Sequence, residues 1–538
     1  MTTLPTFPPL PWLKHLRPQQ ESAIADIVAA FEDGVRVVVL DAPTGSGKTL
    51  IAEFVRRALD DRTLYVCSSL SLQDQFVRDF PFAALLKGRA NYQPFDEQSL
   101  GEPVTCADCD IGKKQSCATC RGSGTFLGVL DDEDKHCSLC HPPGMCPYKR
   151  ARRAALVAPL ACVNTAYFLT EANYVGGFSD VPLVIVDECD TLEATLLNFA
   201  TIEITERAQE NWGVLRPGAQ SGPKLVEWVE RTALRLKTRL DTMIEMDDAN
   251  ALTIRERRDM GHLQSLCRKF EGLRMGLDAG EWLCTSTGPK IIFKPTTVKG
   301  LGQEWLWQHG QRWLFMSASV LDAGELLGSV GYTPEIGRVA CVEVESTFPP
   351  ENRPIVVQPI AKMTYTHLEK SKPLMAKAIL DIMEAHPDER ILIHTWTYAL
   401  TKYFSENLPS QRLLAYLHAN QREAALNAFK FMDNAVLLAS SFARGVDLKD
   451  DLCRVIIIPK IPYVGLDDVQ VKARMAEPDG QTWYTVQTAR TILQMTGRGV
   501  RHETDTCITY ILDAQFSTFW QQAKLLFPDY WKAALQWR

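Results

Sequence analysis

Short, continuous runs of apolar residues recur along the chain, and most of them are followed by a pattern of helical period. Eight such runs cover residues 35–45, 63–69, 182–188, 312–319, 390–396, 434–441, 453–459 and 507–513. Continuous apolar runs are typical of strands that are buried on both faces, whereas half-exposed strands alternate apolar and polar positions. The pattern predicts an α/β fold with two parallel sheets, one before and one after about residue 340.

A different pattern lies between the third and fourth runs. Two segments there, 224–246 and 254–274, carry apolar residues at helical spacing, so that each segment has one apolar face. These faces consist of Leu225, Trp228, Val229, Leu236, Leu240 and Met243 in the first segment and of Leu263, Leu266, Phe270 and Leu273 in the second. We therefore predict a helical insertion in the first α/β domain.

Composition adds limits to this picture. At roughly 150 residues per domain, a chain of 538 residues should form three or four domains. The formal net charge of -7 gives no overall basic footprint, so contact with nucleic acid must come from local patches such as Lys149, Arg150, Arg152 and Arg153. The start of the sequence has no charged n-region and no long apolar run follows, which predicts a cytoplasmic protein without signal peptide or membrane span.

Cysteines are concentrated in one region of the sequence. Of the 15 cysteines, seven fall within about 40 residues: Cys106, Cys109, Cys117, Cys120, Cys137, Cys140 and Cys146. The other eight are scattered, which argues against a disulfide framework. Paired C-x-x-C spacing suits metal chemistry, because two thiolates on one tight turn can bind one ion or one edge of a cluster. The region is therefore predicted to bind zinc or an iron–sulfur cluster.

A phosphate-binding loop is predicted at residues 42–49, APTGSGKT, which follow an apolar run and precede a helical pattern. Backbone N–H groups of a Gly-rich turn at a helix N-terminus can surround a phosphate. This predicted cradle consists of Thr44, Gly45, Ser46 and Gly47. Lys48 would reach the β- and γ-phosphate oxygens, and Thr49 would ligate Mg²⁺.

Two further motifs supply the remaining groups for nucleotide hydrolysis. VIVDECD (184–190) places Asp187 near the water shell of the metal and Glu188 where it can accept a proton from the attacking water. QMTGRGVR (494–501) offers Gln494, Arg498 and Arg501, and we expect its two arginines to form one helical cationic face that stabilises charge on the γ-phosphate across a domain interface. A site completed by two domains opens and closes with the nucleotide, as a motor requires.

The ordered motifs resemble those of superfamily-2 helicases of the DinG/XPD group. Besides the three motifs above, the resemblance rests on LRPQQ (16–20), SSLSLQDQF (68–76), MSAS (316–319), ESTFPPENRP (345–354) and ARGVDL (443–448). KGRANY (87–92), CPY (146–148) and VNTAYFL (163–169) are similar to segments of this group in particular. By this resemblance, Gln20 would contact the nucleotide base, and ATP and Mg²⁺ would be the cofactors.

The resemblance also implies an architecture and an activity. It implies two RecA-like motor domains, with a [4Fe–4S] insertion and a helical Arch insertion in the first. The expected boundaries are 1–92, 151–195 and 289–340 for the first motor domain, 93–150 for the cysteine-rich insertion, 196–288 for the Arch-like insertion and 341–538 for the second motor domain. It implies ATP-dependent movement 5′ to 3′ along single-stranded DNA, unwinding at duplex junctions, and a DNA-facing role for the basic run 149–153.

Several positions depart from the family pattern. Gln93 stands where the family has its first cluster ligand. Cys106, Cys109 and Cys146 have XPD-like spacing, whereas Cys137, Cys140 and Cys146 have DinG-like spacing, and residues 117–124 resemble a zinc knuckle. Zinc therefore remains an alternative to the cluster. The second motif is DECD, with Cys189 and Asp190 at its end, and Arg444 replaces a glutamate of the family.

A second function stays open at this point. The chain could be a nucleotide-switched module that binds nucleic acid or recruits a partner through a zinc finger, as an accessory factor of a mobile element or CRISPR system. The sequence identifies no protein partner.

Overall fold

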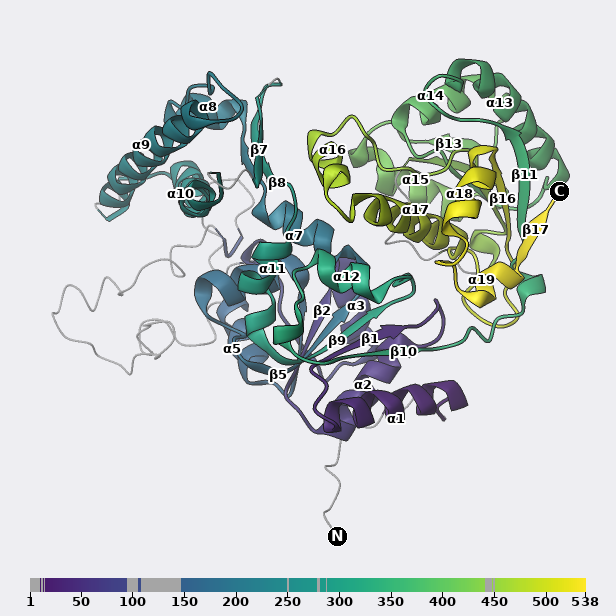
Figure 1. The fold of residues 1–538 in the computed structure, drawn as a ribbon, viewed down its shortest axis with the longest axis horizontal. Helices are drawn as coiled ribbons and strands as arrows, with labels where there is room; N and C mark the ends of the chain where they lie inside the picture. Colours follow the sequence, from purple (N-terminus) through teal and green to yellow (C-terminus); the bar gives the residue numbers. More distant parts are fainter. Residues whose placement is uncertain are drawn as a thin grey trace, which may run out of the picture.

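The computed structural model describes residues 10, 13, 15–93, 105–107, 147–248, 251–277, 281–286, 288–440, 448 and 450–538. Two halves, each built on a parallel sheet, lie side by side, and a smaller helical unit projects from the first half on the side away from the C-terminus (Figure 1). The architecture confirms the predicted α/β fold with two parallel sheets. Within the part of the chain that is described, no helix combines the length and apolar character that a membrane crossing requires.

The first sheet has seven strands among the described residues, and every neighbouring pair is parallel. In spatial order they are β10 (Val339–Glu343), β1 (Val37–Asp41), β9 (Gly310–Ser317), β5 (Val181–Asp187), β2 (Thr63–Cys67), β4 (Leu160–Asn164) and β3 (Ala84–Leu85). The central strands are buried almost throughout, as their continuous apolar sequences predict.

Helices cover both faces of this sheet, because alternate residues of each strand point to opposite sides. One face packs against α1 (Pro18–Glu32), α2 (Lys48–Leu59) and α3 (Leu70–Asp79). The other packs against α5 (Pro147–Val157), α6 (Thr165–Thr170), α7 (Leu192–Ala200), α11 (Lys299–Trp305) and α12 (Ala323–Ser329). On β1, Val38 and Leu40 belong to the first layer and Val37 and Val39 to the second.

The second sheet is also parallel and has seven strands within the described ranges. Their order is β13 (Leu413–Ala415), β14 (Val436–Ala439), β12 (Ile391–His394), β15 (Val455–Ile458), β16 (Ile508–Asp513), β11 (Ile355–Ala361) and β17 (Leu535–Trp537). One face packs against α13 (Leu368–Ala385) and α14 (Tyr398–Asn407), and the other against α15 (Arg422–Phe431), α17 (Gly480–Thr496), α18 (Gln515–Ala523) and α19 (Asp529–Ala533). Helix α16 (Val469–Ala476) precedes α17 on the side that faces the first half.

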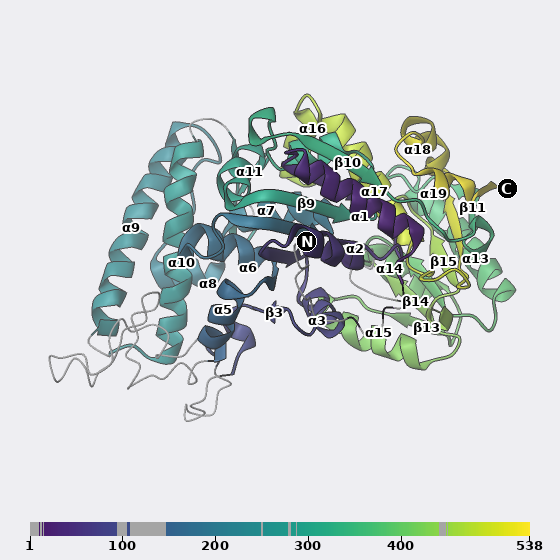
Figure 2. The same ribbon diagram turned by 90° about the horizontal axis from the view of Figure 1, so that it is seen from below.

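The projecting unit contains α8 (Glu206–Trp212) and two long helices, α9 (Pro223–Asp248) and α10 (Ile254–Leu277), which stand together at one end of the molecule (Figure 2). The predicted apolar faces of α9 and α10 form its core, with Leu240 partly buried and the other nine residues buried. A small antiparallel sheet that the sequence did not reveal completes the unit, in the order β6 (Ile202–Ile204), β8 (Ile291–Pro295) and β7 (Trp282–Thr285). The division of the chain into domains by residue number remains a prediction.

Candidate nucleotide site at the junction of the two sheets

The predicted phosphate-binding loop joins the end of β1 to the start of α2. Helix α2 begins at Lys48, directly after Gly47, and both Gly45 and Gly47 have φ of 82°. Side chains are strained in this left-handed region, which favours glycine. A Cβ atom on Gly45 would also lie 2.3 Å from the ring of Phe348 and 2.9 Å from the carbonyl oxygen of Arg501. The loop therefore packs against Phe348 and Arg501, which both follow the last strand of the first sheet in the sequence.

Two side chains from the start of α1 brace this loop. Gln20 Nε2 donates to the carbonyl of Ser46 at 2.8 Å, and Gln20 Oε1 accepts from the amide of Arg17 at 2.9 Å. The Arg17 guanidinium donates to the carbonyl of Gly45 at 3.0 Å. The predicted base-binding residue Gln20 is thus already bonded to the loop, and its contact with a base remains a prediction.

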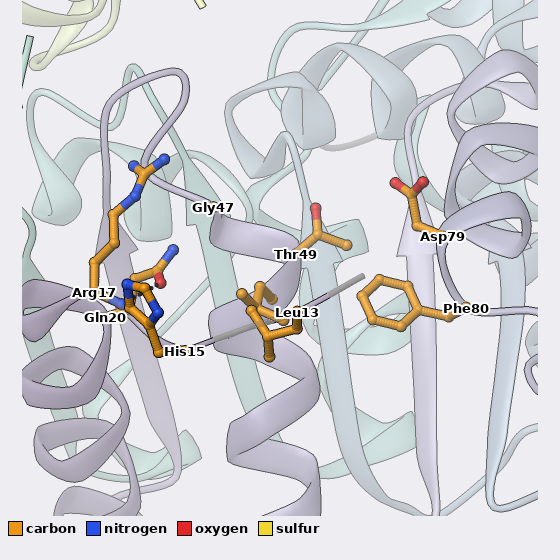
Figure 3. Close-up of a pocket in the computed structure, with 9 residues that line it drawn as sticks. Leu13, His15, Arg17, Gln20, Gly47, Thr49, Asp79 and Phe80 are labelled. Carbon is orange, nitrogen blue, oxygen red and sulfur yellow. Dashed lines mark hydrogen bonds between the residues drawn. The ribbon is translucent and has the colours of Figure 1, made fainter. Parts of the chain in front are cut away.

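A cavity of about 500 Å³ opens beside this bracing (Figure 3). Leu13 and Phe80 supply apolar walls, while His15, Arg17 and Gln20 supply polar groups, and Thr49 lies at the α2 end. Apolar walls with a few polar groups are typical of small-ligand sites of this size. The cavity can therefore receive the base of a nucleotide whose phosphates occupy the loop.

Lys48 and Asp187 face one another in the core of the site. Lys48 Nζ donates to the carbonyl of Ala42 at 3.1 Å, and one oxygen of Asp187 accepts from the amide of Glu188 at 3.0 Å. Burial raises the pKa of the Asp187 carboxyl, and the positive charge of Lys48 acts in the opposite direction. Glu188 has φ of 52°, a left-handed conformation that directs the chain sharply out of β5. The structure brings these three predicted residues to one place.

The donor set beside Lys48 fits a magnesium ion. The Thr49 hydroxyl and the Asp187 carboxylate are hard oxygen ligands of the kind that Mg²⁺ takes, directly or through water. The hydroxyl of Tyr65 lies next to both groups, and it is buried without a well-aligned hydrogen bond. The residues present therefore fit the ion that the family resemblance implies.

The last residue of the DECD motif links the two halves of the molecule. Asp190 accepts hydrogen bonds from Ser317 Oγ at 2.8 Å and Ser319 Oγ at 3.0 Å, both at the end of β9. It also accepts from Gln494 Nε2 of α17 at 2.6 Å, and Gln494 donates to Ser319 Oγ at 2.9 Å. Asp190 and the two serines were absent from the predicted site. Their signal in the sequence was the presence of DECD, MSAS and QMTGRGVR in one chain.

Arg498 and Arg501 lie outside the helix on which we expected them. Helix α17 ends at Thr496, so the prediction of one helical cationic face is wrong. The turn after the helix packs closely, because a Cβ atom on Gly499 would lie 2.2 Å from the sulfur of Cys507. The turn nevertheless meets the phosphate loop: a Cβ on Gly497 would lie 3.8 Å from Thr44 Oγ1, and the Arg501 carbonyl adjoins Gly45.

Arg501 also holds the shape of this turn. Its guanidinium donates to the carbonyl of Gly497 at 2.8 Å, and its amide donates to Asp505 at 3.1 Å. Arg498 lies close to His394, a fully buried residue at the end of β12. Burial, together with the charge of Arg498, lowers the pKa of His394 to about 3, so that His394 is neutral and Arg498 is the cation at this point.

Buried charged side chains also connect the two halves near α12. Arg490, one turn before Gln494, forms an ion pair of 2.8 Å with Glu325 and donates to the carbonyls of Ser319 and Val320. Glu193 of α7 accepts from Trp483 Nε1 at 2.9 Å and from Gln487 Nε2 at 3.2 Å. Burial raises the pKa of Glu193 to about 7, and the neighbouring charge of Glu325 adds to the effect.

The raised pKa of Glu193 predicts a dependence of stability on pH. Below the usual glutamate pKa of about 4.3, the carboxyl is protonated in both folded and unfolded chains and burial carries no ionisation penalty. As the pH rises towards about 7, the unfolded chain loses its proton first, so that stability falls across this window.

Glu193→Gln keeps an oxygen acceptor for Trp483, and we expect it to raise stability by about 1 kcal/mol at pH 8 but not at pH 5. Thermal unfolding at both pH values checks this, with exposed Glu227→Gln as control; an equal change at both would contradict it.

The basic run on α5 differs from its predicted role at one position. Tyr148, Arg152 and Ala155 form the buried face of α5, and Arg152 makes an ion pair of 2.7 Å with the buried carboxylate of Glu171. The prediction that Arg152 faces DNA is therefore wrong, because its helical position turns it towards the sheet. Arg150 is exposed, and the DNA-facing role of Lys149, Arg150 and Arg153 remains a prediction.

The cysteine-rich segment contributes one described thiol. Cys106 is buried in the same core as Tyr148, and its amide donates to the carbonyl of Tyr92 at 2.8 Å. Cys109, Cys117, Cys120, Cys137, Cys140 and Cys146 lie outside the described residues, as does Arg444. Among the residues that are described, no group of three or more His, Cys, Asp or Glu side chains is placed to hold a metal ion.

Comparisons with known proteins agree with this arrangement. Residues 379–534 match the family model described as Helicase C-terminal domain, and residues 13–116 match that of Type III restriction enzyme, res subunit. The ATP-dependent DNA helicase YoaA of Escherichia coli is 24% identical over 94% of this chain and 92% of its own length. YoaA of Haemophilus influenzae is 23% identical over 93% and 91%.

Solved structures of XPD proteins share the fold. One titled XPD helicase has a TM-score of 0.63 at 15% identity and covers 98% of this chain and 100% of its own. Xpd4 of S. tokodaii has a TM-score of 0.59 at 12% identity, covering 97% and 100%. The two family models, the nearly full-length relatives and the XPD-like fold together confirm that the chain resembles superfamily-2 helicases of the DinG/XPD group.

Proposed function

We propose that the chain is an ATP-dependent DNA helicase that moves 5′ to 3′ along a single strand and unwinds duplexes at junctions. The observation that carries the proposal is the hydrogen bond of 2.6 Å from Gln494 to Asp190. This bond joins the second half of the molecule to the turn that follows Asp187 at the end of β5. Hydrolysis at such a site changes the contact between the halves, which is how a motor converts nucleotide turnover into movement.

Each group in the site has a role in this proposal. The backbone of residues 44–47 would hold the phosphates and Lys48 would offset their charge, while Thr49 and Asp187 would hold Mg²⁺. The ion neutralises charge on the β- and γ-phosphates when it is bound. Glu188 accepts the proton of the attacking water, and Arg498 and Arg501 stabilise the charge that develops on the γ-phosphate.

The cysteine-rich segment enters the proposal as a metal-binding insertion. The soft thiol of Cys106 suits either a [4Fe–4S] cluster or zinc. Its position in the same core as Tyr148, the second residue of α5, would couple metal binding to the basic helix. Elemental analysis of an anaerobic preparation for iron and zinc distinguishes the two.

The alternative, a nucleotide-switched recruiting module, is less well supported. A switch can dispense with some of the groups that act only in the transition state. Here Lys48, Glu188, Gln494, Arg498 and Arg501 are all present in the sequence. These positions favour a hydrolytic motor over a binding switch.

Strand displacement tests the proposed function and its direction. We expect a duplex with a 5′ single-stranded tail to be unwound in the presence of ATP and Mg²⁺, and a duplex with a 3′ tail to remain paired. Labelled strand release from the two substrates, compared at equal binding, measures this. Faster release from the 3′-tailed duplex would overturn the direction.

A further inference from the structure

The hydroxyl of Tyr65 is a buried polar group that the site as described leaves unused. Tyr65 is 1% exposed, and its oxygen has no hydrogen-bond partner of good geometry. Burying a hydroxyl without a hydrogen-bond partner lowers the stability of the folded state. In native proteins such groups commonly bind an ion or a water or have a catalytic role. Tyr65 therefore calls for an explanation.

The placement of Tyr65 is determined by two neighbouring strands and one ring contact. On β2 it pairs with Ile185 of β5, two residues before Asp187, so that its long side chain extends along β5 towards the end of that strand. Its ring stacks on Phe76 of α3, with centroids 4.0 Å apart and planes at 24°. The stacking holds the ring in place, and the hydroxyl proton can still rotate about the C–O bond.

Two groups lie next to this hydroxyl, and both belong to the proposed magnesium site. They are the Thr49 hydroxyl at the start of α2 and the Asp187 carboxylate at the end of β5. Neither makes a well-aligned hydrogen bond to Tyr65 in this structure. A tyrosine phenol, with an ordinary pKa of about 10, keeps its proton at neutral pH and can donate it.

We propose that Tyr65 is a positioning residue of the magnesium site, which donates a hydrogen bond to Asp187 when the metal–nucleotide complex is bound. This inference rests on the proposed nucleotide function. One carboxylate oxygen of Asp187 would accept from Tyr65, leaving the other for the water shell of the ion, while the Thr49 hydroxyl would turn its lone pair towards the metal. Partners of this kind orient metal-binding carboxylates, and their loss weakens metal binding.

Binding of Mn²⁺, a paramagnetic substitute for Mg²⁺, tests the inference without relying on activity. The full chain is mixed with ADP, and free Mn²⁺ is followed by electron paramagnetic resonance. We expect Tyr65→Phe to reduce Mn²⁺ affinity by about 10-fold, with ADP affinity in EDTA unchanged. Removing only the hydroxyl keeps the ring and its stacking on Phe76.

Tyr332→Phe is the matched control. It also loses one tyrosine hydroxyl in the first half, one that donates to the carbonyl of Gly337 on the far side of the sheet. We expect wild-type Mn²⁺ affinity in this variant. Wild-type Mn²⁺ affinity in Tyr65→Phe would overturn the inference, as would an equal loss of ADP affinity in EDTA. If the unmodified chain bound neither ADP nor Mn²⁺ with ADP, the proposed function would fall first.

Discussion

Lys48→Ala is expected to reduce ATP turnover by about 100-fold or more while leaving the fold intact. Within the described part of the chain, the ammonium group donates a hydrogen bond to the carbonyl of Ala42 and forms no ion pair. Its main effect is therefore on the phosphates, whose charge it offsets as the bond to the leaving group breaks. Steady-state ATP hydrolysis at saturating nucleotide measures the loss.

Two controls accompany this variant. Thermal unfolding should be close to wild type, because the backbone of the loop is held by Gln20 and Arg17 independently of Lys48. Lys48→Arg keeps the charge but not the reach of the ammonium, and we expect it to recover part of the nucleotide binding and little of the turnover. Near-normal turnover in Lys48→Ala would show that the loop is not a phosphate site.

Arg498→Ala is expected to lower turnover by about 1000-fold with little change in nucleotide affinity. The residue lies in the turn after α17, next to a histidine that is neutral because of its burial. The turn that carries it touches the phosphate loop at Gly45 and Thr44. A group of this kind stabilises charge that develops only in the transition state.

The measurement separates turnover from binding. Turnover is measured at saturating ATP, and affinity with a fluorescent nucleotide. Arg501 is the less suitable position, because its guanidinium also bonds to the carbonyl of Gly497 and helps to form the turn. Weaker nucleotide binding with unchanged turnover at saturation would make Arg498 a binding residue instead.

The sequence was most informative about the centres of the two sheets. All eight apolar runs form strands, since strands buried on both faces need continuous apolar sequence. The inner strands β4 and β11 were missed, as were all four edge strands: β3 has two residues, β13 and β17 have three each, and β10 is half-exposed. Such strands depend on the neighbour that they pair with, and their own sequence carries little periodicity.

Local motifs and long-range contacts also differed in how far they could be predicted. The phosphate loop was predictable because its glycines, its lysine and its helix start lie within eight residues. The bonds of Asp190 were not. Those to Ser317 and Ser319 join ends of strands that are 127 and 129 residues apart in the sequence, and the bond to Gln494 forms only when the two sheets dock across 304 residues. The ion pair of Arg152 with Glu171 was also not predictable, because the basic run does not indicate which of its arginines points into the core.

The central claim is that hydrolysis at the junction of the two sheets is coupled to nucleic acid. The most direct test is ATP turnover by the unmodified chain, measured with Mg²⁺ in the presence and absence of single-stranded DNA. The account predicts turnover that is at least several-fold faster with single-stranded DNA, and a stimulation that disappears when the strand is fully paired into a blunt duplex. A rate that is the same with and without DNA, although the DNA is bound, would contradict it.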